Sequence, residues 1–172
     1  VSLAIGQQAS TPQKAERKSI DQLKENDRAE ILGTVVQVFD PKFFEVCPMC
    51  SKRARLKDGA FMCDEHNKVN PVYSYVMNVF IDDGKDSIRT VFFREQMLKL
   101  LNLNGSQVLQ FKDAPEAFEQ IKNDLLGNIV KLRGRAKKNT MFDRLEFACD
   151  EVDISPDPNE EAKRLESEDI VE

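Results

Sequence analysis

The sequence predicts a mainly β protein with five strands, helical stretches in its second half and one cysteine-rich insertion. Two observations predict this class: apolar and polar residues alternate along several short runs, and residues typical of turns separate those runs. The chain of 172 residues has room for one ordinary domain with extensions. Because 41% of the residues are hydrophobic and 32% are charged, we expect a packed core beneath a densely charged surface.

A polar segment precedes the first expected strand. Residues 1–18 are rich in Gln, Ser, Thr and Lys, and we expect them to form a linker. Ordered structure is expected over residues 19–155, and its first strand lies in the β-branched run from Ala29 to Phe39. Gly33 interrupts that run and indicates a bulge or a sharp bend. The cysteine-rich insertion, residues 45–70, comes next.

A hairpin is expected after the insertion. The run from Tyr73 to Ile81 alternates between two faces, Asp83-Gly84 is typical of a tight turn, and Ile88 to Phe93 returns as a strand. Two helical stretches follow, at Glu95 to Leu103 and at Pro115 to Leu126.

The last two strands are expected in "NIVKLRGRAKK" and "RLEFACDEVDI", which a short tip at residues 139–143 joins. Five strands with a helix between the third and fourth have the count and order of an OB-fold barrel, and the insertion then lies between the first and second strands. We expect Cys149, in the last strand, to be a small buried residue. The acidic segment 156–172 is expected to be either a helix or a disordered tail.

Four potential metal ligands lie in the insertion. Cys47, Cys50, Cys63 and His66 have the spacing C-x2-C-x12-C-x2-H. Zinc favours tetrahedral thiolate and imidazole ligands that are held in such short turns. Because the protein fills all four positions, no position is left for an activated water, and we expect one structural Zn²⁺ that supplies free energy of folding to the insertion.

Two enzymatic interpretations of the same residues have less support than a structural zinc site. A redox Cys-x-x-Cys is expected in a βαβ setting, which the predicted elements do not provide. A zinc deaminase needs a histidine before its Cys-x-x-Cys pair, and the only histidine of the chain, His66, follows it. The sequence also has no P-loop, G-x-S-x-G or H-E-x-x-H motif, so we expect neither an enzyme nor a site for a small-molecule substrate.

The charge of the chain is distributed unevenly. Residues 146–172 carry 11 acidic and 2 basic side chains, a net charge of −9, which leaves a net charge of +4 on residues 1–145. The overall net charge of −5 therefore does not exclude a polyanionic partner. The sequence has no apolar run near the roughly 18 residues of a membrane helix and no secretory signal at its start. We expect an intracellular protein without a membrane partner.

Basic and aromatic residues are interleaved in three parts of the chain. They occur in the insertion, in the third expected strand and around the tip at residues 139–143. Cations for phosphates and flat rings for unstacked bases are what a barrel needs to hold a single strand. If Ile88 and Phe92 face the core, Arg89 and Phe93 share the opposite face of their strand.

Two stretches resemble a known family. "SIRTVFFREQ" resembles the third-strand motif of replication protein A OB folds, which implies that Arg89 and Phe93 contact single-stranded DNA. "FFEVCPMC", "GAFMCDEH" and "YSYVMNVFIDD" together resemble the C-terminal OB domain of the large subunit, in which a zinc ribbon is inserted between the first two strands. The resemblance covers about residues 20–155. The candidate contacts to nucleic acid are Arg89, Phe93, Arg135, Lys137 and Phe142, with Phe44 and Tyr73 as further candidates.

The resemblance implies non-catalytic binding of single-stranded DNA in replication, recombination and repair. It also implies a heterotrimer with two smaller OB-fold subunits, assembled through a C-terminal helix. The sequence departs from the family at the strongly acidic 156–172 segment and at His66, which replaces the commoner fourth cysteine. The compact ribbon and high charge suit an archaeal version, in the cytoplasm or nucleoid, better than a eukaryotic nuclear one.

Two other functions remain open at this point. The domain could be mainly an assembly core that holds partner subunits, or an enzyme subunit that binds RNA or tRNA. The residues alone do not separate RNA from DNA, because that choice depends on contacts to the 2′-hydroxyl.

Overall fold

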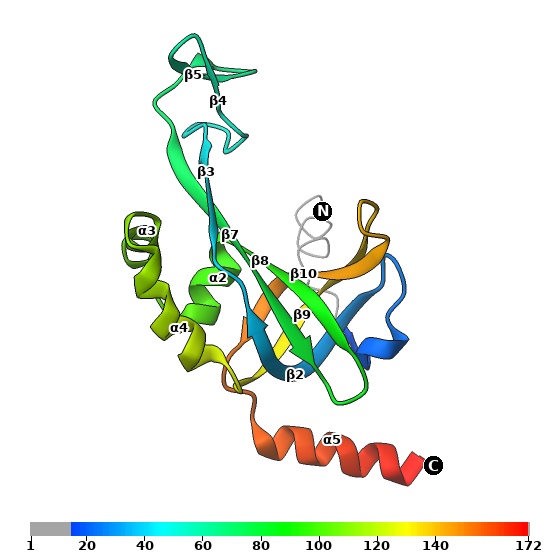
Figure 1. Ribbon diagram of the computed structural model, residues 1–172. Helices are drawn as coiled ribbons and strands as arrows, with labels where there is room; N and C mark the ends of the chain where they lie inside the picture. The colour runs from blue at the N-terminus through cyan, green and yellow to red at the C-terminus, as the bar shows by residue number, and fades with distance from the viewer. Residues whose placement is uncertain (1–14, 172) are drawn as a thin grey trace, which may run out of the picture.

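The computed structural model describes residues 15–171, with side chains described as far as Glu166. Figure 1 shows a curved main sheet, a two-stranded stalk that rises from it to a small second sheet, helices along one side, and a last helix beneath. Within the described residues, no helix is both long and apolar enough to cross a membrane.

Five strands form the body of the main sheet, as the alternating pattern predicts. They are β2 (Arg28–Val38), β7 (Val72–Asp82), β8 (Ser87–Phe93), β9 (Ile129–Asn139) and β10 (Arg144–Asp153). Neighbouring strands pair in the order β2, β9, β10, β8 and β7, and only β10 with β8 is parallel among these pairs. The first half of β2 pairs with β9 and its second half with β7. The predicted mainly β fold, with a sheet of the OB-fold type, is confirmed.

Gly33 lies where β2 passes from one partner strand to the other. A Cβ atom at this position would lie 2.6 Å from Cγ2 of Ile81 and 2.9 Å from the carbonyl oxygen of Asp82. Glycine therefore allows the backbones of β2 and β7 to approach. The irregularity in the pairing with β7 comes between Val35 and Gln37, so a bulge lies at Val36 and not at Gly33 itself.

The core is formed by the inward-facing residues of the main sheet and by apolar residues of the helices that pack on it. The largest fully buried side chains include Tyr75, Phe92, Phe118 and Phe147. Cys149 is also buried, as predicted, and burial raises the pKa of its thiol to about 12. The thiol therefore acts as a small apolar side chain.

Three α-helices lie between β8 and β9 in the sequence. They are α2 (Arg94–Leu101), α3 (Gly105–Asp113) and α4 (Phe118–Leu125), and a short 3₁₀ turn, η2 (Pro115–Ala117), precedes α4. The first and last correspond to the two predicted helical stretches, whereas α3 was not predicted. Its start carries a capping box, in which the side chain of Asn104 accepts a hydrogen bond from the backbone N–H of Gln107 and the Gln107 side chain accepts one from Asn104.

The insertion comprises a stalk and a small sheet. The stalk pairs β3 (Lys42–Val46), which was not predicted, with the first half of β7. The small sheet contains β4 (Arg55–Lys57), β5 (Ala60–Cys63) and β6 (Asn67–Lys68). Figure 1 shows this sheet at the far end of the stalk, away from the core of the main sheet.

Regular secondary structure occurs at both ends of the described chain, where we predicted a linker and either a helix or a disordered tail. Strand β1 (Glu16–Arg17) pairs in parallel with β2, so the prediction of a linker over residues 1–18 is wrong at its end. Residues 1–14 lie outside the described part of the chain. A short 3₁₀ turn, η1 (Ile20–Gln22), follows β1. The acidic segment forms a helix, α5 (Pro158–Val171), rather than a disordered tail.

Candidate metal centre and nucleic-acid interface

The four predicted metal ligands lie together at the base of the small sheet. The ligand atoms of Cys47, Cys50, Cys63 and His66 are all within 4.8 Å of one another. Cys50 Sγ lies 3.5 Å from Cys63 Sγ, and His66 Nδ1 lies 3.5 Å from Cys47 Sγ and 3.7 Å from Cys63 Sγ. A tetrahedral ion with bonds of about 2.3 Å to sulfur separates its ligands by about 3.7 Å. The cluster therefore has the dimensions of a four-coordinate metal site.

Two similar turns bring the ligands to this point. In the first turn the backbone N–H of Ser51 donates to the carbonyl of Cys47 at 2.9 Å, and Ser51 has φ of 62°. In the second turn Asn67 has φ of 57°. In both turns the residue directly after the second ligand takes the left-handed conformation, which reverses the chain and lets both ligands of a pair face the same point.

The small sheet has little apolar core of its own. Its buried residues are Cys47, Ala54, Cys63 and Val69, so two of the four are predicted metal ligands. The backbone N–H of Glu65 and the imidazole of His66 lower the pKa of Cys63 to about 6, which favours the thiolate that binds metal. The donor set and its geometry thus suit a bound ion that stabilises this sheet.

The two faces of β8 have the orientation that its sequence predicts. Ile88, Thr90 and Phe92 are buried, whereas Arg89 and Phe93 lie on the outer face. The side chain of Phe93 is 51% exposed. A cation and an accessible ring therefore occupy one surface of the strand, four residues apart.

Arg89 packs against a pair of contacting phenylalanine rings. Its Cζ atom is 4.6 Å from the ring centroid of Phe39 and 5.4 Å from that of Phe80. The two rings are themselves 5.7 Å apart. These contacts hold the guanidinium in place. Neither ring was among the predicted contacts, although the alternation of β7 places Phe80 on the outer face and the pairing sets it opposite Arg89.

The aromatic residues of the outer face extend onto the stalk. On β7, Val76 pairs with Phe93 on one side, and Ser74 pairs with Phe44 on the other. Directly paired residues share a face, and alternate residues of one strand do so as well. We call Phe39, Phe44, Phe80, Arg89 and Phe93 together the aromatic face. At its stalk end, Arg53 Cζ lies 5.2 Å from the ring centroid of Phe44.

A second group of predicted contacts lies on β9 and on the tip that joins it to β10. Arg135 and Lys137 are exposed on β9, and Lys137 pairs with Glu146, which pairs in turn with Arg89. Phe142 is 59% exposed at the tip, and Arg144 Cζ lies 4.7 Å from its ring centroid.

A groove extends from the aromatic face to Arg144 of the second group. Its volume is about 410 Å³, and it is lined by Phe80, Arg89 and Arg144, by the acidic Asp21 and Asp86, and by apolar residues of η1, β8 and β10. Within the described chain, Nε of Arg89 is buried there without a hydrogen-bond partner. The groove therefore presents two guanidinium groups and one aromatic ring, with two carboxylates in its wall.

Tyr73 is not brought together with the other predicted contacts. It pairs with Glu45, so it points to the opposite side of the stalk from Phe44. The ammonium of Lys112 lies 4.1 Å from the centroid of its ring. Tyr73 therefore packs towards α3 rather than along the aromatic face.

Comparisons with known proteins bear on this arrangement. The model of the replication factor-A C terminal domain family matches residues 29–165. A structure of a replication protein A heterotrimer bound to single-stranded DNA is similar, with a TM-score of 0.73 and 19% identity over 89% of this chain and 39% of that chain. Yeast RPA bound to single-stranded DNA has a TM-score of 0.71 and 18% identity, over 94% of this chain and 100% of that chain. No curated protein matches the chain.

Proposed function

We propose, because the chain belongs to the replication factor-A C terminal domain family, that it binds single-stranded DNA as part of a replication protein A complex. The similar heterotrimer and yeast structures are both complexes with single-stranded DNA. The observation that carries the proposal is the aromatic face, where Phe93 and Phe44 lie on the outer surface to one side of the cation of Arg89. The process served would be DNA replication, with recombination and repair as further expected roles.

The proposed mechanism needs no catalytic group. Unstacked bases would stack on Phe93 and Phe44 at one end of the site and on Phe142 at the other, each ring contributing about 1–3 kcal/mol. Arg89, Arg135 and Lys137 would neutralise phosphates and release counterions, so affinity should fall as salt rises. Duplex DNA offers no free base faces and should bind more weakly.

The architecture proposed for this role is a five-stranded OB barrel with a zinc ribbon inserted between its first two strands. Cys47, Cys50, Cys63 and His66 would hold one Zn²⁺, and their four donor atoms complete a tetrahedral shell. The ion would be structural. It would fix the small sheet and thereby the position of Arg53 beside Phe44.

A titration of the zinc-loaded chain with fluorescent single-stranded and duplex oligonucleotides tests the proposal. At low salt we expect single-strand-selective binding, and Phe93→Ala should weaken it by about 5- to 150-fold, the equivalent of one stacked base. Tyr73→Ala removes an aromatic ring from the opposite side of the stalk and should have a much smaller effect. No measurable binding of single strands, or equal effects of the two variants, would overturn the assignment.

An assembly core is the second candidate function, and α5 favours it. A helix at the C-terminal end is what the family resemblance implies for contact with two smaller OB-fold subunits. Deleting residues 156–172 should then abolish formation of the complex and leave the affinity for single strands unchanged. Co-purification with the two subunits, followed by DNA titration of the truncated chain, separates the two functions. The remaining alternative is RNA binding, and a titration with an RNA oligonucleotide of the same base sequence as the DNA tests it.

A further inference from the structure

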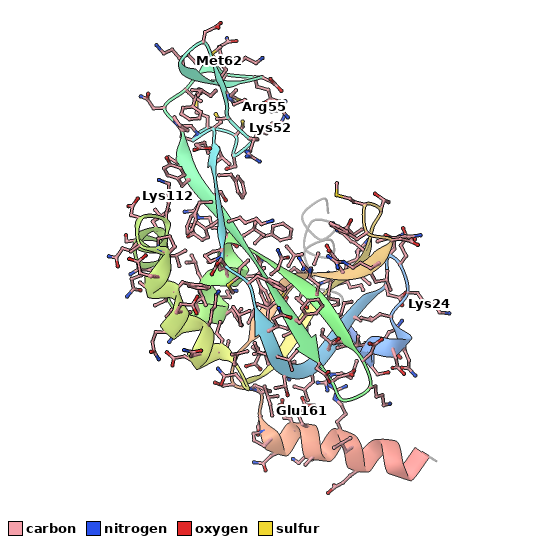
Figure 2. All side chains as sticks on the ribbon, viewed as in Figure 1. Lys24, Lys52, Arg55, Met62, Lys112 and Glu161 are labelled. Carbon is pink, nitrogen blue, oxygen red and sulfur yellow. The ribbon has the colours of Figure 1, made fainter. Side chains whose placement is uncertain are left out.

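Helix α5 contacts the rest of the protein through charged side chains. The guanidinium of Arg17 binds the carboxylate of Glu161 with two parallel hydrogen bonds, from Nη1 to Oε2 at 2.8 Å and from Nη2 to Oε1 at 2.9 Å. Lys131 Nζ lies 3.5 Å from the same carboxylate. Figure 2 shows Glu161 on the side of α5 that faces the main sheet. Bidentate arginine–carboxylate pairs fix the orientation of the two side chains as well as their distance.

Arg17 is itself held by a buried acid of β2. Its Nε and Nη2 atoms donate to Glu30 Oε1 at 3.0 and 2.8 Å, and Glu30 is only 3% exposed. Arg133 binds the other oxygen of Glu30 at 2.9 Å, and Arg164 of α5 approaches Glu30 at 3.5 Å. Arg17, on β1, thus connects β2 of the main sheet with α5.

Among the side chains that the structure describes, as far as Glu166, apolar packing contributes little to the position of α5. The apolar side chains described on this helix beyond its first turn, Ala162 and Leu165, are both exposed, Leu165 to 62%. A cavity of about 450 Å³, lined by Leu32 and Asp83 on the sheet side and by Glu161 and Leu165 on the helix side, separates α5 from β2. A short helix normally depends on a buried apolar face, whereas the described side chains of α5 contact the rest of the protein through ion pairs.

We propose that Arg17 is a polar latch that holds α5 against the main sheet, and that breaking the Arg17–Glu161 contact releases the helix. The strength of such a latch depends on ionic strength, because part-exposed pairs are screened by salt. This inference goes beyond the proposed function. If α5 is the assembly helix, partner subunits compete with Arg17 for binding to it. Strand β1, which carries Arg17, then influences assembly through α5.

Backbone ¹⁵N relaxation of the full zinc-loaded chain tests the latch without DNA or partner. In the native chain at about 0.05 M salt, α5 amides should have order parameters near those of the main sheet, about 0.85. In Glu161→Gln they should fall below about 0.6, because the variant removes the negative charge and one of the two hydrogen bonds to Arg17 but leaves Arg17 bound to Glu30. About 1 M salt should have the same effect on the native chain.

Glu160→Gln is the matched control. It removes the same charge from the same helical turn, but Glu160 contacts only Lys131, at 3.9 Å. Its α5 amides should stay as ordered as in the native chain, and amide signals of β2 and β9 report that the main sheet is intact in every variant. Equal behaviour of the two variants, or an α5 that is already mobile in the native chain at low salt, would overturn the proposal. Because no ligand is present, neither result depends on whether the chain binds DNA.

Discussion

The main sheet and the small sheet of β4, β5 and β6 are stabilised by different kinds of interaction. The main sheet buries large side chains such as Tyr75, Phe92 and Phe147 completely. The small sheet buries only Cys47, Ala54, Cys63 and Val69, of which two are predicted metal ligands. Apolar burial yields about 25 cal/mol per Å², so the second set cannot order a sheet alone. The main sheet therefore has a self-sufficient core, whereas the small sheet is expected to depend on the proposed ion.

Chelation of the proposed ion should have the largest effect, because it should unfold the small sheet and leave the main sheet intact. Metal binding to structural zinc sites contributes about 10–16 kcal/mol, so chelation should unfold the small sheet. Amide signals of residues 47–69 should collapse towards random-coil positions, whereas those of β2, β9 and β10 should persist. Added Zn²⁺ should restore the spectrum. A spectrum unchanged by complete chelation would show that the small sheet does not need the ion.

Phe92→Ala should damage the main sheet strongly. Phe92 is fully buried, and loss of a buried phenylalanine costs about 3–5 kcal/mol. Its neighbour Phe93 lies on the outer face, so Phe93→Ala should change the free energy of unfolding by only about 0.5 kcal/mol. Chemical denaturation of both variants measures the difference. Similar losses in the two variants would contradict the assigned orientation of β8.

Glu30→Gln should weaken the main sheet, because Glu30 is the one buried acid among the described residues. Burial alone would raise the pKa of Glu30, but hydrogen bonds from Arg133 and Arg17 outweigh it and lower that pKa below its ordinary value of 4.5. The ionised form therefore contributes stability above about pH 4.5, and this contribution is lost as pH falls through the lower folded-state pKa.

The variant should lose about 1–3 kcal/mol of unfolding free energy near pH 7, and the gap to the native chain should narrow as pH falls below about 4. Hydrogen exchange of β2 and β9 amides at several pH values measures this without interference from the metal site. A gap that stays constant with pH would contradict the assigned ion pairs.

Leu56→Ala should have the smallest effect. Leu56 lies on β4 and is 64% exposed, so its loss should change stability by no more than about 0.5 kcal/mol. Zinc affinity, measured by competition with a chelator, should also be unchanged. A large loss in either quantity would mean that the small sheet has an apolar contribution which its buried residues do not indicate.

Much of this arrangement follows from local patterns. The two-residue alternation of β7 and β8 set which side chains face inward, and this placed Arg89 and Phe93 on the outer face. The ligand spacing identified all four members of the metal cluster, because short turns bring nearby ligands together whatever the rest of the fold does. Helix α3 was missed although its signal is local: Asn104 and Gln107 form a capping box in a stretch with weak apolar periodicity.

Other features depend on segments that are distant in sequence. The pairing register of β3 with β7 decides that Phe44 joins the aromatic face and that Tyr73 does not, and a shift of one residue would exchange them. Phe39 reaches Arg89 only because β2, β7 and β8 are neighbours. The sequence of the acidic α5 segment is compatible with disorder, because the partner of Glu161, Arg17, lies 144 residues away.

The sequence by itself therefore determined the fold class, the members of the Cys47, Cys50, Cys63 and His66 cluster and the inner and outer faces of the strands, because each depends on local spacing. Tertiary structure alone decided which rings share a surface with Arg89 and where α5 lies. Strand register and long-range ion pairs set those positions, and both depend on contacts that no local pattern encodes.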